Sequence, residues 1–237
     1  MKILAIDTSN QTMAVAVTDD NRLLGQLQTT VNKNHSKTLM PAIETLMKEL
    51  ELTPQELDRI VVAQGPGSYT GLRIGVTTAK TLANTLKTEL VGISSLKTIA
   101  GNCYGRKEWI VPLFDARRQN VYAGAYQWQN GQLVNVLADQ HIALATLLAQ
   151  LEGQEVYFVG EDVQKFQEII TETLPNAICN SIISWNYPSG VTLSELGKQA
   201  PTVASHPFLP NYLKRVEAEE KWLETHEIGE ESYVEKI

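Results

Sequence analysis

Cysteine is scarce in this sequence of 237 residues, in which only Cys103 and Cys179 occur, far apart. Two isolated cysteines without ligand spacing argue against a disulfide framework and a cysteine-based zinc site, and they favour a reducing compartment. No apolar run approaches the roughly 20 residues that a membrane span needs. The run at residues 3–6 stops at Asp7 and is too short for a secretory signal. We therefore expect a cytoplasmic protein with no membrane segment.

Basic side chains are also in short supply, since 20 lysines and arginines face 27 acidic residues and the net charge is −7. Over half of this excess lies after residue 210, where eight glutamates outnumber four basic residues. Nucleic-acid binding draws much of its affinity from basic side chains that neutralise phosphates. We therefore do not expect this chain to hold a nucleic acid alone. The acidic end is either a solvated surface or a docking segment, and the sequence leaves both open.

Catalytic motifs are missing as well. No two histidines have the i,i+4 spacing that places two imidazoles on one metal; the four are His35, His141, His206 and His226. No Gly-x-Ser-x-Gly elbow marks a nucleophile. Asp7 and Asp115 each end an apolar segment, as acids that organise a metal and a phosphate often do, but only Asp7 is followed by a polar turn. The sequence thus predicts no catalytic residue, no metal site and no self-sufficient active site.

What is present is a duplicated pattern. Three short apolar segments predict a strand meander at residues 3–6, 13–17 and 23–27, and a second meander at 110–114, 121–126 and 133–137 repeats it. In each copy a helical pattern follows, and then an apolar strand that runs into glycine. We predict an α/β protein of two similar subdomains, residues 1–100 and 101–237. The alternative is a chance match of two meanders.

Residues 65–75 read Gly-Pro-Gly-Ser-Tyr-Thr-Gly-Leu-Arg-Ile-Gly, after a predicted strand and at the start of a predicted helix that runs to about residue 86. Ser68 or Thr70 can cap the free N–H groups of the first turn. A glycine-rich turn at a helix N-terminus is also a place where an anion binds. Neither the Walker A spacing nor the dinucleotide spacing is present. A simple capped turn therefore competes with a weak nucleotide signal.

Small residues recur inside this helix at Gly71, Gly75, Ala79 and Ala83, which places them on one face. Each interior glycine costs about 1 kcal/mol relative to alanine, so a close approach of another backbone is expected to offset the cost. That backbone belongs either to a neighbouring subunit or to the sheet of the chain itself. The pattern alone does not decide between them.

A second helix is predicted before it, at residues 39–50. Its apolar residues fall at helical intervals; they are Leu39, Met40, Ile43, Leu46, Met47 and Leu50. Pro41 fits in a first turn, where the amides lack partners, if Thr38 caps the helix. His35 is interpreted as a surface residue near the helix start.

Together these features resemble the TsaB (YeaZ) family. The resemblance covers nearly the whole chain, and the glycine-rich residues 65–75 are its most specific part. The other matching segments are Ile3-Leu4-Ala5-Ile6-Asp7-Thr8-Ser9, His35-Ser36 with Leu39 and Pro41, Asp115-Ala116-Arg117-Arg118 with Val121-Tyr122, and Pro210-Asn211-Tyr212-Leu213. The last segment is similar to the family's closing Pro-x-Tyr-Leu-Arg, but Lys214 replaces the arginine, so the role of the tail stays open.

The resemblance implies two actin-like (ASKHA, ribonuclease H-like) subdomains, each a mixed sheet with flanking helices. It implies a role in attaching a threonylcarbamoyl group to an adenosine in tRNA. In that family the transfer chemistry belongs to a larger paralogue, TsaD, which carries a histidine pair for a metal, and TsaE, a P-loop ATPase, joins the complex. The chain would then be a non-catalytic scaffold that meets tRNA only through the complex.

The same resemblance implies that no cofactor is required and that ATP or ADP binds weakly or not at all. The residues of a vestigial nucleotide site would be Asp7, Thr8, Ser9, Gly65 and Ser68. It also implies that two N-terminal helices pair with TsaD, or with a second copy in a homodimer. Carried onto this sequence, the interface falls on Leu39, Ile43, Leu46, Met47, Gly71, Ile74, Gly75, Thr78 and Thr81. On this hypothesis Gly75→Leu abolishes the complex and leaves the isolated chain folded.

Two other classes of function compete with the scaffold. Actin-like folds often house phosphoryl transfer, so a small-molecule kinase would use Asp7 to organise a metal and Ser68 at a phosphate turn. A peptidase, an older label in this superfamily, lacks support from any metal pair or nucleophile motif. Calorimetry with Mg-ATP separates the kinase from the scaffold.

Overall fold

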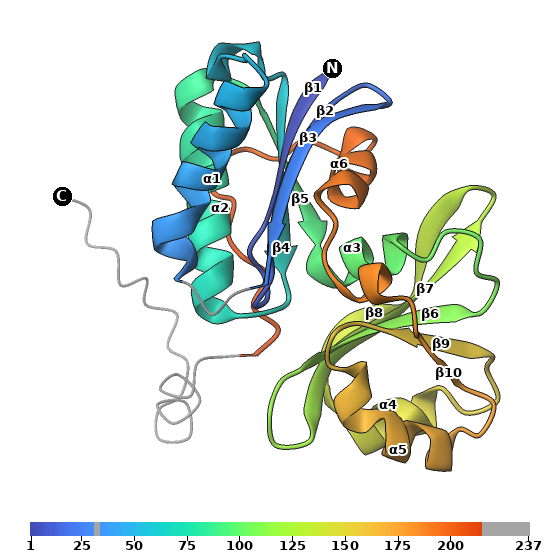
Figure 1. Cartoon of the computed structure of the whole chain (residues 1–237). Helices are drawn as coiled ribbons and strands as arrows, with labels where there is room; N and C mark the ends of the chain where they lie inside the picture. The colour runs from blue at the N-terminus through green and yellow to red at the C-terminus, as the bar shows by residue number, and fades with distance from the viewer. Residues whose placement is uncertain (31–33, 215–237) are drawn as a thin grey trace, which may run out of the picture.

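A computed structural model describes residues 1–30 and 34–214 of the chain, which form two five-stranded mixed sheets with helices around them (Figure 1). The first sheet has the order β3-β2-β1-β4-β5. Its strands are β1 (Lys2–Asp7), β2 (Met13–Asp19), β3 (Arg22–Thr29), β4 (Arg59–Gly65) and β5 (Glu89–Ser94). The helices of this half are α1 (His35–Glu49), α2 (Tyr69–Leu86) and α3 (Ser95–Gly101), with a 3-10 turn at Pro54–Glu56. The α/β class is confirmed.

The second sheet has the order β10-β9-β6-β7-β8. Its strands are β6 (Trp109–Asp115), β7 (Asn120–Gln129), β8 (Gln132–Ala143), β9 (Val156–Val159) and β10 (Ile178–Cys179). The helices are α4 (Leu144–Gln150), α5 (Val163–Thr173) and α6 (Gly190–Lys198), with a 3-10 turn at Ile183–Asn186. In both sheets the first strand pairs antiparallel with the second and parallel with the fourth. The duplicated pattern in the sequence is therefore a duplicated topology.

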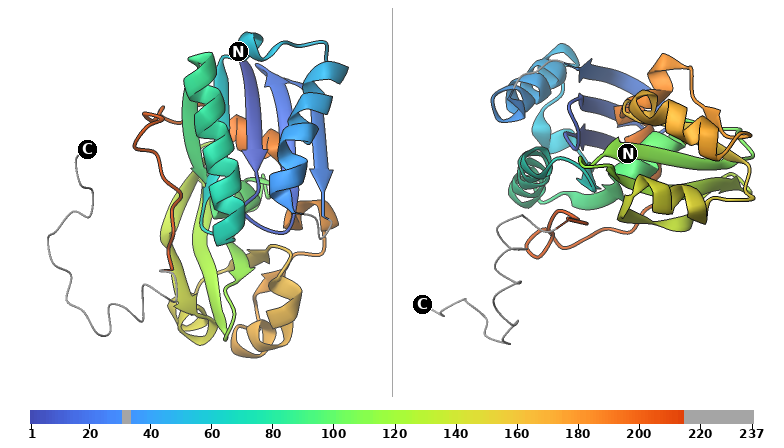
Figure 2. Two further views of the ribbon diagram at one scale, coloured as in Figure 1. Left: turned by 90° about the vertical axis from the view of Figure 1, so that its left-hand side faces the viewer. Right: turned by 90° about the horizontal axis from the view of Figure 1, so that it is seen from below.

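Helices α1 and α2 cover one face of the first sheet, side by side, as the left view of Figure 2 shows. Both bury an apolar stripe on the strands, and this stripe joins the core around Leu4, Val15 and Val62. Helices α3 and α6 lie on the side of this sheet that faces the second subdomain (Figure 1). The layers follow from strands that are apolar on both faces, because a strand buried on two sides needs helices on each.

Helix α1 begins earlier than the sequence predicted. Its cap is Asn34, whose side chain accepts a hydrogen bond from the Ser36 backbone N–H at 3.1 Å. Pro41 therefore lies inside the helix and not in its first turn, so the expected Thr38 cap is wrong. The imidazole Nε2 of His35 lies 2.9 Å from the Asn10 carbonyl oxygen, which ties the start of α1 to the loop after β1.

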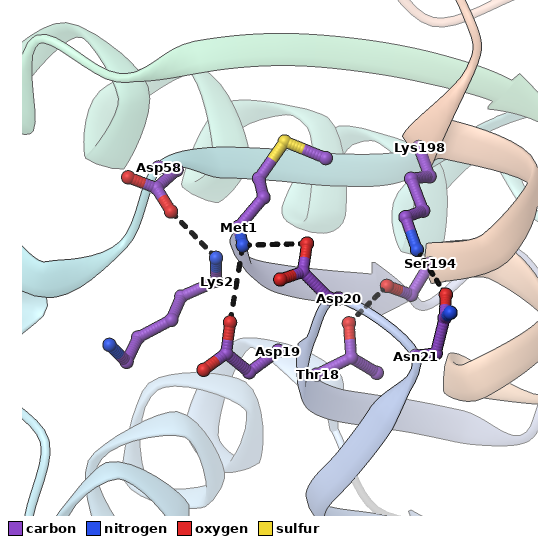
Figure 3. Close-up of polar contacts among 9 residues, drawn as sticks. All are labelled: Met1, Lys2, Thr18, Asp19, Asp20, Asn21, Asp58, Ser194 and Lys198. Carbon is purple, nitrogen blue, oxygen red and sulfur yellow. Dashed lines mark hydrogen bonds and ion pairs between the residues drawn. The ribbon is translucent and has the colours of Figure 1, made fainter.

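Helix α6 returns to the first sheet although it follows the second in sequence. A buried hydrogen bond of 2.6 Å joins the hydroxyls of Thr18 and Ser194, and the Lys198 ammonium donates to the Asn21 side chain at 2.5 Å (Figure 3). Gly197 lets the helix approach closely, because an added Cβ would lie 2.4 Å from a Val61 methyl. The expected second subdomain of residues 101–237 is thus corrected: α6 and residues 203–214 pack with the first sheet.

None of the helices in the described part of the chain combines the length and apolar composition that a membrane span requires.

Candidate functional site

The loop after β1 is closed against the start of helix α2. Asp7, Thr8 and Ser9 are almost completely buried. The Thr8 hydroxyl donates to the Gly71 carbonyl at 2.8 Å, and the Ser68 backbone N–H donates to the Ser9 carbonyl at 2.7 Å. The second bond uses the Ser68 N–H, a donor that a phosphate at this helix start would otherwise contact. Ser68 also caps α2 by accepting from the Gly71 N–H at 3.3 Å, which confirms the predicted cap.

The glycine face of α2 packs on the chain's own β1 loop. A Cβ added at Gly71 would lie 2.1 Å from the Thr8 carbonyl oxygen, and one at Gly75 would lie 2.3 Å from the Thr8 hydroxyl. Ala79 and Ala83 continue this buried face over the sheet. The interface assignment of Gly71 and Gly75 is therefore wrong, because the backbone that they admit is internal. Gly75→Leu would disrupt the fold of the isolated chain and not only a complex.

The predicted contact residues of α1 are core residues as well. Leu39, Ile43, Leu46 and Met47 are between 1% and 8% exposed and belong to the cluster between α1 and the first sheet. They cannot meet a partner without unfolding the helix, so their assignment to an interface is corrected. The amphipathic pattern therefore identified the side of α1 that packs on the sheet. The side of α1 that faces solvent is opposite to it.

Three of the predicted interface residues remain on the surface. Ile74 and Thr78 of α2 are half-buried, and Thr81 is exposed. We use the name outer face for a set of surface residues of these two helices, Met40, Ile74, Thr77, Thr78, Thr81 and Thr85; the exposed side of α1 also carries Lys37, Glu44, Lys48 and Glu49. Met40 is 47% exposed, which is high for a large apolar side chain. The outer face is a surface on which a partner can dock.

A cleft of about 540 Å³ separates the two subdomains at the end of β1 and β6. Ser68 lines it, whereas the other predicted nucleotide-site residues Asp7, Thr8, Ser9 and Gly65 do not. Its charged walls are Asp115, Arg117 and Lys214, which come from the second subdomain and the C-terminal segment. The structure therefore brings only one of the five predicted residues to the cleft.

The segment at residues 203–214 is a part of this site that the sequence did not predict. It runs along the first subdomain, where the Asn211 N–H donates to the Gln64 carbonyl at 2.7 Å and the Lys80 ammonium donates to the His206 carbonyl at 3.0 Å. The Tyr212 ring stacks on Tyr69 with centroids 4.7 Å apart. The segment closes one end of the cleft. The acidic stretch after Lys214 lies outside the described residues.

The two acids that the sequence paired have different surroundings. Asp7 is completely buried, and desolvation raises its pKa to about 6 although the Ser9 N–H donates to it at 2.8 Å. Asp115 lies in the cleft and forms an ion pair of 3.2 Å with Lys165. Hydrogen bonds to Asp162 and Asp115 raise the pKa of the Lys165 ammonium. Within the described residues, no three His, Cys, Asp or Glu side chains gather as a metal site.

Comparisons with known proteins place the chain in a family. The family model described as TsaD, tRNA N6-adenosine threonylcarbamoyltransferase, matches residues 25–222. A protein of Bacillus subtilis named tRNA threonylcarbamoyladenosine biosynthesis protein TsaB is 41% identical over 95% of this chain and 99% of its own length. The chain belongs to the TsaD family and, within it, to the TsaB proteins. A TsaB of Haemophilus influenzae is 23% identical over 90% of this chain and 94% of its own.

The solved structure of YeaZ from Pseudomonas aeruginosa supports the fold of this TsaB-family chain. It superposes with a TM-score of 0.78 at 24% sequence identity and covers 90% of this chain and 99% of the other. The resemblance found in the sequence is thereby confirmed, and with it the two-subdomain actin-like fold and a place in tRNA threonylcarbamoyladenosine biosynthesis.

Proposed function

We propose that this chain is a non-catalytic scaffold subunit that pairs with a TsaD-like catalytic paralogue, which a TsaE-like P-loop ATPase joins. Its place among the TsaB proteins supports a role in this modification of tRNA. The buried Asp7 and the ion-paired Asp115 support a structural role, because neither acid is free to organise a metal and a phosphate. A role in the modification of tRNA also supports a cytoplasmic location for this chain.

The observation that carries the pairing is the outer face of α1 and α2. Along the 18 residues of α2 its exposed side chains are mostly threonines, and Arg73 is the one fully charged side chain that is exposed within the helix. Interface centres are depleted in most charged residues, and methionine is enriched there. Met40 and Ile74 add apolar area to this surface. The same face would serve a homodimer when the catalytic partner is absent.

We propose further that no cofactor is required and that ATP and ADP bind weakly or not at all. The support is the loop of Asp7, Thr8 and Ser9, which is buried and bonded to the start of α2 through the Thr8 hydroxyl and the Ser9 carbonyl. The net charge of −7 supports tRNA contact only through the complex. Calorimetry of the isolated chain with Mg-ATP is expected to give no micromolar affinity. A micromolar affinity would favour the alternative of a small-molecule kinase.

The test of the function is reconstitution of threonylcarbamoyladenosine formation on tRNA from the separate proteins. We expect no product from this chain alone, and a large loss of product when it is omitted from the mixture with its catalytic paralogue and the ATPase. Product from the chain alone, or an unchanged yield without it, contradicts the scaffold role.

A further inference from the structure

A groove of about 630 Å³ lies on the side of the molecule where α6 meets the β7–β8 hairpin, away from the cleft described above. Its three walls are α3, α6 and the hairpin, whose tip is the turn between the two strands (Figure 1). The three walls come together at Gly101, at the end of α3. A Cβ added there would lie 2.6 Å from a Thr192 methyl of α6 and 3.9 Å from Leu133 of the hairpin. The volume is that of a small-molecule site.

The groove has a mixed polar and apolar lining with one aromatic corner. Leu133 and Ile93 are buried residues of its lining. Tyr104 and Trp128 meet edge to face with centroids 4.9 Å apart, and the Tyr104 side chain is 72% exposed. The indole N–H of Trp128 is buried and has no acceptor among the described residues. The exposed Tyr104 ring is the part of this corner that a ligand can contact.

One cation and one anion line this groove, from different helices. Lys97 of α3 is half-buried, and Glu195 of α6 is exposed. Neither side chain has a hydrogen bond or an ion pair with any other residue that the structure describes. Lys97 lies close enough to Asp139 to offset part of the rise that burial causes in the pKa of that carboxyl, but the Asp139 oxygens already accept from the hydroxyls of Ser94 and Tyr126. The Lys97 ammonium and the Glu195 carboxylate are thus available to a ligand.

We propose that this groove binds a small zwitterion with a flat apolar body, of which an aromatic α-amino acid is the simplest example. The Lys97 ammonium would take the ligand carboxylate, the Glu195 carboxylate would take its ammonium, and the Tyr104–Trp128 corner would contact the ring. Charge complementarity of this kind favours a ligand with both signs over a simple acid or amine. The assignment goes beyond the scaffold role and does not depend on it.

Such a ligand would touch both subdomains. Helix α6 is fixed to the first sheet by the Thr18–Ser194 bond, and the hairpin belongs to the second sheet. A bound molecule therefore links the two halves and stabilises one relative position, since a ligand that binds only the folded arrangement adds to its stability. The groove is then a site at which a metabolite can act on the scaffold.

The test is isothermal titration calorimetry of the full chain with L-tryptophan. We expect saturable binding, and Lys97→Gln and Glu195→Gln should each weaken it by about tenfold or more, as expected for a lost charge-assisted hydrogen bond. The control variants are Lys107→Gln and Glu168→Gln, which change exposed charges outside the groove and should leave the affinity unchanged. Circular dichroism melts verify that all four variants are folded.

A second ligand separates the zwitterion from other occupants. N-acetyl-L-tryptophanamide keeps the ring and removes both charges, so it should bind at least about tenfold more weakly than L-tryptophan. Equal binding of the two compounds would mean that the groove takes an apolar side chain of a protein segment, and it would overturn the proposal. Absence of saturable binding up to millimolar L-tryptophan, or equal affinity in the Lys97 and Glu195 variants, would overturn it as well.

Discussion

Asp7 shows how the residue scale constrains function in this chain. Its carboxylate lies at the end of β1 with one oxygen bonded to the Ser9 N–H and the other, Oδ2, without a partner among the described residues. Because burial disfavours the charged form, the pKa rises from 3.8 to about 6. The folded state therefore binds more protons than the unfolded chain between these values. Stability from this group falls as pH rises through that window.

Asp7→Asn tests this charge directly. The amide keeps the acceptor for Ser9 and removes the buried charge, so the variant should gain stability over the wild type at about pH 7.5 by up to about 3 kcal/mol. The gain should shrink towards about pH 5, where the wild-type acid is largely protonated. Urea unfolding at both pH values measures it, with the exposed Glu44→Gln as control. A difference that does not change with pH would show that Asp7 is not destabilised by burial.

Gly71→Ala tests the internal contact of α2. The new methyl group would lie 2.1 Å from the Thr8 carbonyl oxygen, and backbone must move to admit it. We expect a loss of about 1–3 kcal/mol, which exceeds the gain in helix propensity of about 1 kcal/mol. Thr77→Ala on the exposed side of the same helix should change stability by no more than about 0.5 kcal/mol. If urea unfolding gives both variants the stability of the wild type, the close packing of this face is refuted.

The residue scale also shows what a sequence can give. A cap at Ser68 or Thr70 was predictable because a short hydroxyl side chain before a helix commonly accepts from a first-turn N–H, and the structure selects Ser68. The enclosure of Asp7 was not, since it depends on Gly67, Gly71 and Gly75, which are far from it in sequence and admit the loop. The stacking of Tyr212 on Tyr69 was equally hidden, because a contact across more than a hundred residues leaves no local pattern.

At the scale of elements, helical periodicity located the buried stripes but not what covers them. Gly71, Gly75, Ala79 and Ala83 lie on one face in the sequence and in the structure. A small-residue face accepts any close backbone, and here the backbone is the β1 loop of the same chain. The same holds for α1, where Leu39 and Ile43 pack on the sheet beneath them. Helical periodicity identifies which side of a helix is buried, but only the three-dimensional structure shows what packs against that side.

Helix α6 is an element whose attachment can be measured. Thr18→Val or Ser194→Ala each leaves one buried hydroxyl unpaired and should cost about 1–3 kcal/mol. The double variant should cost less than the sum, because removing both hydroxyls leaves no unsatisfied group. Lys198→Gln, whose bond to Asn21 is exposed, should cost no more than about 0.5 kcal/mol. Strictly additive costs in thermal or urea unfolding would mean that the hydroxyls do not interact in solution.

At the scale of the whole molecule, the duplication and the α/β class were predictable because each half repeats strand lengths, turns and a closing glycine. The return of α6 and residues 203–214 to the first sheet was not predictable, since their composition does not indicate on which of the two sheets they pack. This return joins the two subdomains, and among the described residues it leaves the outer face of α1 and α2 uncovered. The scaffold proposal therefore depends on that face and no longer on the glycines.

The most direct test of the scaffold is the mass in solution of an equimolar mixture of this chain and its TsaD-like paralogue, by light scattering after gel filtration. The wild type should run as a complex with the summed mass. Thr81→Arg places a charge on the outer face without touching the core and should run as separate components. Gln167→Arg on α5 is the matched control and should retain the complex. A complex of unchanged mass with Thr81→Arg, or none with the wild type, would contradict the account.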